Sequence, residues 1–187
     1  MFPLVLNREL DLLGWRLVEG GLAYADYRQE VASLLLRHFN CSRVAVWRLS
    51  TADGSRRLDC LDAYSAAGVR TSDEDALPES RLGAYFQELV QHGAYVCDDT
   101  HIDPNLDSMS HRFRRPGAPR AFLDALVTVN AQALGVLSCQ QSPHPRVWNI
   151  SDSMALKKCS AKVALHLSRM SPSVLDATVC GRPESVD

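Results

Sequence analysis

Several features that identify a function quickly are missing from this sequence. None of its six cysteines forms a CxxC pair, the spacing typical of zinc and redox sites. No uninterrupted apolar run approaches the roughly 20 residues of a membrane helix, and Asn7, Arg8 and Glu9 interrupt any apolar region of a secretion signal. The formal net charge of -2 leaves no excess of Lys and Arg for nucleic acid. These absences predict a cytoplasmic protein with reduced thiols that binds neither membranes nor nucleic acid.

What is present is the composition of one globular domain. The chain has 187 residues, of which 46% are hydrophobic and 22% charged, enough to bury a core without disulfides or a metal. We predict an N-terminal helix within residues 1–21 and a main domain over residues 22–171. Residues 172–187 show no periodic pattern and are expected to form a disordered tail.

Apolar residues at helical spacing predict the long helices. They recur from Leu4 to Leu17, from about Ala23 to Phe39, from Leu82 to a stop at Gly93, and from Ser151 to about Arg169. Asn40 and Gly93 are expected helix ends because both residue types tolerate the left-handed conformation. Ser151 is expected to cap the last helix, with Asp152 in its first turn.

A period of two predicts five strands, at Arg43–Leu49, Arg57–Tyr64, Ala94–Cys97, Phe122–Val129 and Leu134–Cys139. The first two and the last two strands each form a hairpin, so the sheet is expected to be antiparallel. Residues 98–119 carry no strong periodicity, and a segment of that length is usually mobile or functional. The basic run within it and just after it (Arg112, Arg114, Arg115 and Arg120) is typical of a solvated loop, with phosphate binding as the alternative.

Residues Val31 to Leu167 resemble the GAF domain family, as found in bacterial sensor kinases and cyclic-di-nucleotide enzymes. Three stretches carry the resemblance by their order and spacing. They are Ser42–Trp47, like the family's first strand; Ala84–Leu89 followed by Asp99–Pro104, like its middle helix and the loop after the next strand; and Leu134–Cys139 followed by Pro145–Trp148 and Ser151-Asp152, like its last strand, loop and final helix.

The resemblance implies an α/β (α+β) fold with a GAF-like central antiparallel sheet of five to six strands and helices on both faces. The first long helix and the last would share one face and form a homodimer. The opposite face, roofed by residues 98–119, would hold a small-molecule pocket. The expected function is that of a non-catalytic signalling module, which relays ligand binding through its terminal helices to a separate effector protein.

Seven residues are candidate ligand contacts on this basis. Asp99 and Asp103 can accept hydrogen bonds from a ligand, although Asp also caps turns and short helices. Cys97 and His101 are four residues apart and could join a metal or haem site, although a buried Cys often only packs. The full set is Cys60, Tyr64, Cys97, Asp99, His101, Asp103 and Phe113. Tyr85 and Phe86 are expected to be core residues because they complete a helix stripe, and Trp47 is expected to have a structural role.

Two other functions stay open from sequence. One is an interaction-only dimerisation module whose own side chains fill the pocket. The other is a thiol-dependent free methionine sulfoxide reductase using Cys60 and Cys97, which would need a reactive thiolate. The phytochrome-like branch of the family attaches a bilin through a cysteine near the ligand, and residues 107–113 contain none. No catalytic residue, metal or cofactor is assigned, and the ligand is not identified.

Overall fold

A computed structural model of the chain describes residues 4–52, 54–65, 68, 70–71 and 76–170. The expected tail at 172–187 lies outside these residues, as does Cys180. The helices are α1 (Leu4–Val18), α2 (Tyr24–Phe39), α3 (Gly83–His92), the 3-10 helix η1 (Pro104–Met109), α4 (Ser110–Phe113) and α5 (Ile150–Ser168). The strands are β1 (Arg43–Ala52), β2 (Ser55–Ser65), β3 (Arg70–Thr71), β4 (Leu77–Pro78), β5 (Ala94–Cys97), β6 (Ala121–Val129) and β7 (Gln132–Gln141).

The strands form one antiparallel sheet in the order β3-β2-β1-β7-β6-β5, with β4 also paired to β2. The hairpins β1–β2 and β6–β7 are joined where β1 pairs with β7. The predicted antiparallel sheet is therefore confirmed, and the five predicted strands are all present. The two-residue strands β3 and β4 were not predicted, because both fall in a polar stretch without alternation.

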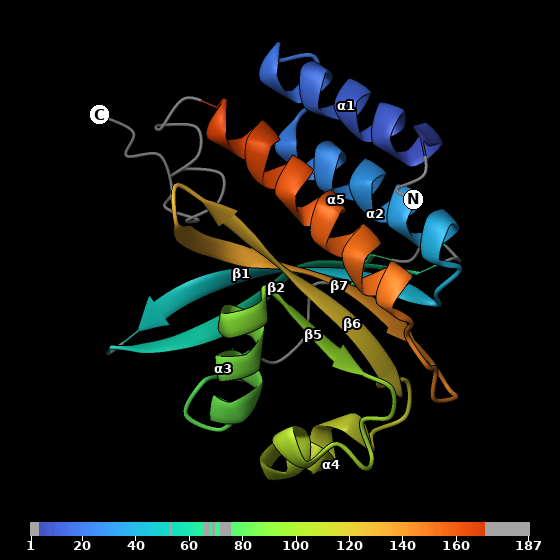
Figure 1. Cartoon of the computed structure of the whole chain (residues 1–187), viewed down its shortest axis with the longest axis vertical. Coiled ribbons are helices and arrows are strands. Elements are labelled where there is room, and N and C mark those ends of the chain that lie inside the picture. The colour runs from blue at the N-terminus through green and yellow to red at the C-terminus, as the bar shows by residue number, and fades with distance from the viewer. Residues whose placement is uncertain (1–3, 53, 66–67, 69, 72–75, 171–187) are drawn as a thin grey trace.

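Helices cover both faces of the sheet, as expected. Figure 1 shows α1, α2 and α5 on one side and α3 with α4 on the other. Alternation along β1 places Val44 and Val46 in the core under α2 and α5, while Ala45 and Trp47 enter the core under α3 and α4. We call these the helix-side core and the cavity-side core.

Helix α1 packs on α5 and α2 and shares the helix-side core with them. Its buried residues are Leu6, Leu10, Leu13, Gly14 and Leu17. Gly14 allows the closest approach, because a Cβ atom built there would lie 2.1 Å from the His166 ring on α5. Burial lowers the pKa of His166, and its Nδ1 lies 2.8 Å from the Tyr27 hydroxyl on α2. This pair joins α5 to α2 beneath α1.

Gly14→Ala is expected to lower the free energy of unfolding by about 1–2 kcal/mol, because the added methyl group must displace the His166 ring. Urea unfolding followed by circular dichroism measures the change. The matched control is Gly83→Ala on α3, where an added Cβ meets no atom within 4 Å. Equal stability of the two variants would contradict the tight packing of α1 on α5.

The helix ends agree with the sequence in two cases and differ in a third. Asn40 and Gly93 are left-handed, with φ of 46° and 70°, as predicted. The prediction that Ser151 caps α5 is wrong. Asn149 is the cap, and it forms a reciprocal capping box with Asp152, so α5 begins at Ile150.

Among the described residues, no helix has both the length and the apolar composition that crossing a membrane requires.

Candidate functional site

A cavity lies between the sheet and the helices on the α3 side. The space between its atoms totals about 400 Å³ when the opening to solvent is included, and the centre of a water-sized sphere can occupy about 30 Å³ of it. A space of that size holds about one or two water molecules. A larger molecule therefore enters only if the covering residues move. The aromatic wall residues are Trp47, Tyr85, Phe113 and Phe122, and the polar ones are Arg112, Asp124, Ser138 and Gln140.

Strands β6 and β7 supply the polar floor of the cavity. Asp124 on β6 lies directly opposite Ser138 on β7, and Phe122 lies opposite Gln140. Residues two apart on a strand share a face, so these four side chains point to the cavity side. The intervening Leu123 belongs to the helix-side core. One strand thus connects the cavity to the helix layer.

Asp124 is the central charged group of this floor. It is 4% exposed, and its Oδ2 accepts a 2.7 Å hydrogen bond from the Tyr85 hydroxyl on α3. Burial raises its pKa from 3.8 to about 6, although the nearby hydroxyl groups of Ser138 and Tyr85 favour the ionised form. Ser138 Oγ in turn accepts a 3.1 Å hydrogen bond from Gln140 Nε2. The floor is therefore a buried carboxylate held by Tyr85, beside a hydrogen-bonded pair formed by Gln140 and Ser138.

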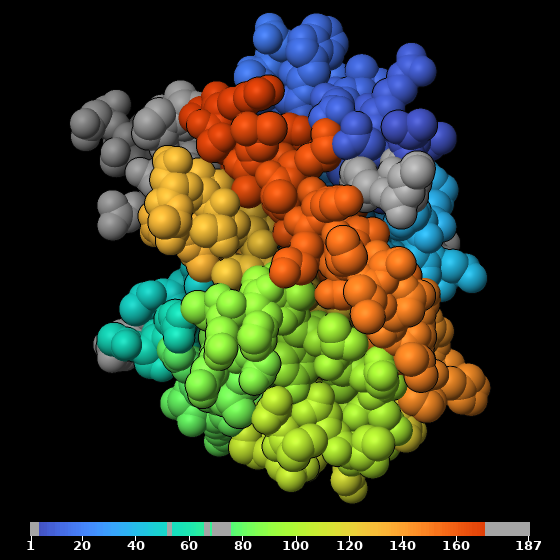
Figure 2. All heavy atoms as spheres, viewed as in Figure 1, coloured from blue at the N-terminus to red at the C-terminus, as the bar shows by residue number. Residues whose placement is uncertain are grey.

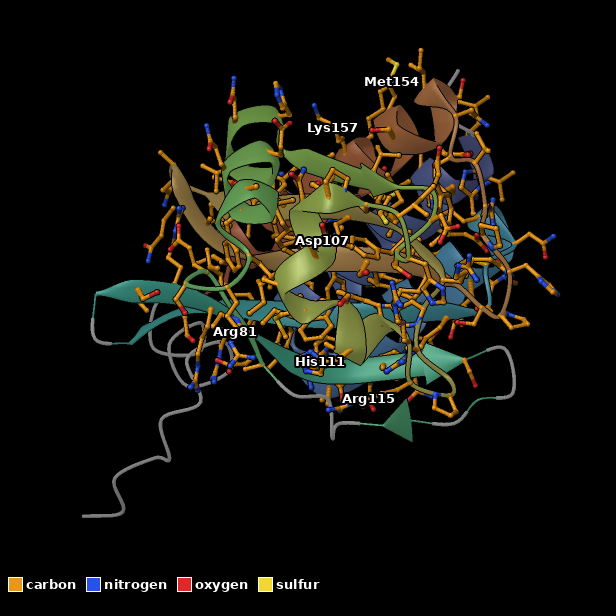
Figure 3. The ribbon with its side chains drawn as sticks, turned by 90° about the horizontal axis from the view of Figure 1, so that it is seen from below. Arg81, Asp107, His111, Arg115, Met154 and Lys157 are labelled. Atoms are coloured by element: carbon orange, nitrogen blue, oxygen red, sulfur yellow. The ribbon has the colours of Figure 1, made fainter. Side chains whose placement is uncertain are left out.

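Residues 98–119, the roof segment, cover the cavity with η1 and α4. Figure 3 views this segment from below, with Asp107 labelled on η1 and His111 on α4. Its entry and exit are tied together, because the Arg120 guanidinium donates to both Asp99 oxygens at 2.6 and 2.8 Å. These hydrogen bonds lower the pKa of Asp99 to about 2. The roof is anchored at its base.

Further contacts fix the middle of the roof segment. Asp103 caps η1 through the Asn105 N–H, and both of its oxygens accept from the Tyr95 hydroxyl, at 2.8 and 2.9 Å. The His101 ring contacts the Phe113 carbonyl, with Nε2 at 3.2 Å. Asp99, His101 and Asp103 thus make local contacts that shape the roof, and none of them is among the residues that line the cavity.

The other four predicted ligand contacts do not lie on the same face of the sheet. Phe113 lines the cavity, and its ring stacks on Phe122 with centroids 6.1 Å apart. Cys97 belongs to the cavity-side core and Cys60 packs against it, but neither lines the cavity. Tyr64 lies in the helix-side core, on the opposite face of the sheet. The structure therefore does not bring the seven residues together.

The polar floor is the part of the site that the sequence did not reveal. Asp124, Ser138 and Gln140 sit in two strands whose other buried positions carry apolar residues. An acidic residue inside such a strand is a usable signal, because a carboxylate is rarely buried without a role. Tyr85 is buried as predicted, Trp47 is buried too, and both also form walls of the cavity.

The thiols on this side of the sheet are protonated at neutral pH. Burial raises the pKa of Cys60 to about 11 and that of Cys97 further above its usual range. Within the described ranges, no three His, Cys, Asp or Glu side chains gather in a way that could hold a metal ion. Among the residues that were described, Cys97 and His101 therefore have no neighbour that could serve as the third ligand of a metal site.

Comparison with known proteins gives one family and one fold. The family model for the GAF domain matches residues 28–167, about three quarters of the chain. The GAF domain of PixJ from Thermosynechococcus elongatus, in its blue-light absorbing form, is similar with a TM-score of 0.63 and 15% identity, covering 100% of both chains. No curated protein matches the chain.

Two further solved structures share the fold. Residues 122 to 287 of a methyl-accepting chemotaxis protein give a TM-score of 0.64 at 16% identity, covering 93% of this chain and 99% of that one. JSC1_58120g3, in its far-red absorbing dark state with bound biliverdin IXa, gives 0.65 at 13% identity, covering 86% and 98%. The family match and the shared fold agree with the order of helices and strands, and the chain belongs to the GAF domain family.

Proposed function

We propose that this domain is a non-catalytic regulatory sensor, which binds a small molecule in the cavity beneath the roof segment. The observation that carries the proposal is the buried carboxylate of Asp124 at the floor of a largely aromatic cavity. Ligand pockets are typically apolar with a few convergent polar groups. A structural neighbour with bound biliverdin supports a binding role for this fold.

The relay from the cavity runs through β6. Asp124 faces the cavity, while its neighbours Leu123 and Ala125 pack in the helix-side core with α5. A ligand that shifts Asp124 therefore shifts the floor on which α5 rests. Binding would favour one packing of the helix layer over another, which is a population shift.

The terminal helices provide the output surface. On α1, Val5, Leu12 and Trp15 lie along one stripe and are 71%, 58% and 62% exposed. On α5, Met154 and Leu165 are also exposed. Figure 2 shows α5 lying flush against α1 on the surface of the molecule. A homodimer through these helices would bury this apolar area and carry the signal to a separate effector protein.

The thiol reductase alternative is disfavoured by the cavity-side cysteines. Both thiols have raised pKa values, whereas a nucleophilic cysteine needs a thiolate near neutral pH. The interaction-only alternative predicts a cavity filled by its own side chains, and the small volume of this cavity is close to that prediction. What favours a ligand instead is the buried carboxylate of Asp124 at the cavity floor. Turnover detected in a coupled assay on free methionine sulfoxide would support the reductase hypothesis instead.

Native mass spectrometry of freshly purified protein tests the proposal, together with a thermal-shift screen of amines, carboxylates and nucleobases. We expect a dimer and at least one compound that stabilises the wild type. The Ser138→Leu variant, whose side chain would occupy the cavity, should lose that response, while Ser33→Leu on the outer surface of α2 keeps it. The proposal fails if no compound stabilises the wild type more than the Ser138→Leu variant.

A further inference from the structure

Two buried oxygen atoms at the cavity floor have no hydrogen-bond donor within the described part of the chain. They are Asp124 Oδ1 and Gln140 Oε1, and both residues are 4% exposed. The Ser138 hydroxyl lies near the carboxylate but makes no hydrogen bond of normal geometry with Oδ1. Buried polar atoms nearly always have partners, so two acceptors in one cavity point to a missing donor.

The chemistry of the missing partner follows from the groups around it. Both orphan atoms accept hydrogen bonds, so the partner must donate at least two N–H or O–H bonds. One of the acceptors is ionised at neutral pH, which favours a cation. The walls are the aromatic rings of Trp47, Phe113 and Phe122, whose faces attract an ammonium group. Mg²⁺ and Ca²⁺ are poor fits, because each would need six or more oxygen ligands.

We propose that this cavity receives the primary ammonium group of a small organic amine, with Asp124 and Gln140 accepting its N–H bonds. The inference rests on the proposed sensor function and names its ligand class. Arg112 also lines the cavity, with its guanidinium 5.9 Å from the Trp47 ring centroid. The ammonium end of the amine points toward Asp124, because that carboxylate is the anionic group of the lining, and the rest of the amine would extend toward the opening.

An NMR titration of the ¹⁵N-labelled full chain at pH 7.5 tests this with methylammonium chloride and methanol. The two probes have the same number of heavy atoms and suit a cavity of about 30 Å³ without movement of the roof. Methylammonium is expected to shift β6 and β7 resonances and to bind about tenfold or more tightly than methanol, because its hydrogen bonds are charge-assisted. Sodium chloride at matched concentration controls for ionic strength.

Two variants locate the interaction. Asp124→Asn keeps the shape of the side chain and is expected to weaken methylammonium binding about tenfold or more. Asp107→Asn removes the same charge from the exposed surface of η1, labelled in Figure 3, and should leave binding unchanged. Gln140→Leu removes the other acceptor and should also weaken methylammonium binding. This second variant keeps the test valid if Asp124→Asn fails to fold.

The outcomes separate this inference from the sensor function. If methylammonium binds no better than methanol, or equally well to Asp124→Asn, the floor holds an ordered water molecule only and the inference is wrong. Neutral compounds that stabilise the wild type but not Ser138→Leu would leave the sensor function standing in that case. Absence of any cavity-dependent binding in either experiment overturns both.

Discussion

Asp124→Asn is expected to make the domain more stable at neutral pH while it removes the charge that the proposed ligand needs. The carboxyl group is buried, and its pKa rises from 3.8 to about 6 in the folded protein. A difference of that size corresponds to roughly 3 kcal/mol of instability when the group is ionised. Asparagine carries no charge to desolvate, so we expect a gain of about 1–3 kcal/mol at pH 8.

The gain should depend on pH in a defined direction. The folded protein binds the Asp124 proton more tightly than the unfolded chain, so the wild type loses stability as the pH rises from about 4 to about 6. Above that range, the difference in the free energy of unfolding between the wild type and Asp124→Asn is constant. Among the described residues, the charge of Asp124 acts on Tyr85, Cys97 and Cys139, and all three have raised pKa values, so none of them titrates in this window.

Urea unfolding of both proteins at pH 4, 5, 6 and 8 measures the effect. The exposed Asp107→Asn variant serves as the control and should follow the wild type at every pH. An Asp124→Asn protein that is less stable than the wild type at pH 8 would mean that the Tyr85 hydrogen bond outweighs the burial of the charge. A stability difference that does not change between pH 4 and 8 would contradict the raised pKa.

A destabilising carboxylate at the floor of a cavity suggests selection for binding rather than for stability. Functional sites often hold groups whose replacement would make the protein more stable. Asp124 fits that pattern, because an apolar residue at the same place in β6 would extend the cavity-side core. The combination of a stability gain and a loss of amine binding in one variant would be difficult to explain by a purely structural role.

The helices and the main strands were predictable because their apolar patterns are long. Val44, Val46 and Trp47 alternate cleanly along β1, and the stripe on α3 that includes Tyr85 and Phe86 is regular. Short elements leave no such signal, which explains why β3 and β4 were missed. The cap of α5 was misplaced by two residues, because Asn149 and Ser151 are both good cap residues and only the three-dimensional capping box selects the first.

The position of Tyr64 was not predictable because of a bulge in β2. Strict alternation from Cys60 would bring Tyr64 to the cavity side. The pairing with β1 runs from Trp47 opposite Cys60 to Val46 opposite Asp62, so Leu61 is an extra residue. One extra residue reverses the faces of everything that follows. Tyr64 therefore joins the helix-side core, and the cavity floor comes from β6 and β7 instead.

The same bulge turns Asp62 toward α2, where Arg28→Met is expected to have the largest effect on stability. Asp62 is fully buried, and its Oδ2 lies 2.5 Å from Arg28 Nε. The Arg28 guanidinium also stacks over the Tyr24 ring, 4.6 Å from its centroid. Removing the guanidinium breaks this buried ion pair from one side, which typically costs about 3–5 kcal/mol.

Two comparisons isolate the cause of that loss. Arg37→Met changes the same residue type on the same helix, but the Arg37 pair with Glu9 is exposed and 3.8 Å long, so it should cost less than about 0.5 kcal/mol. The double variant Arg28→Met/Asp62→Leu removes both charges and should recover most of the lost stability. If the double variant is no more stable than Arg28→Met alone, the loss comes from the packing of the Arg28 side chain on Tyr24 rather than from the buried charge. If the double variant regains the lost stability, the bulge has a structural purpose. It turns Asp62 away from the cavity and toward α2, where the ion pair with Arg28 fixes α2 to the sheet.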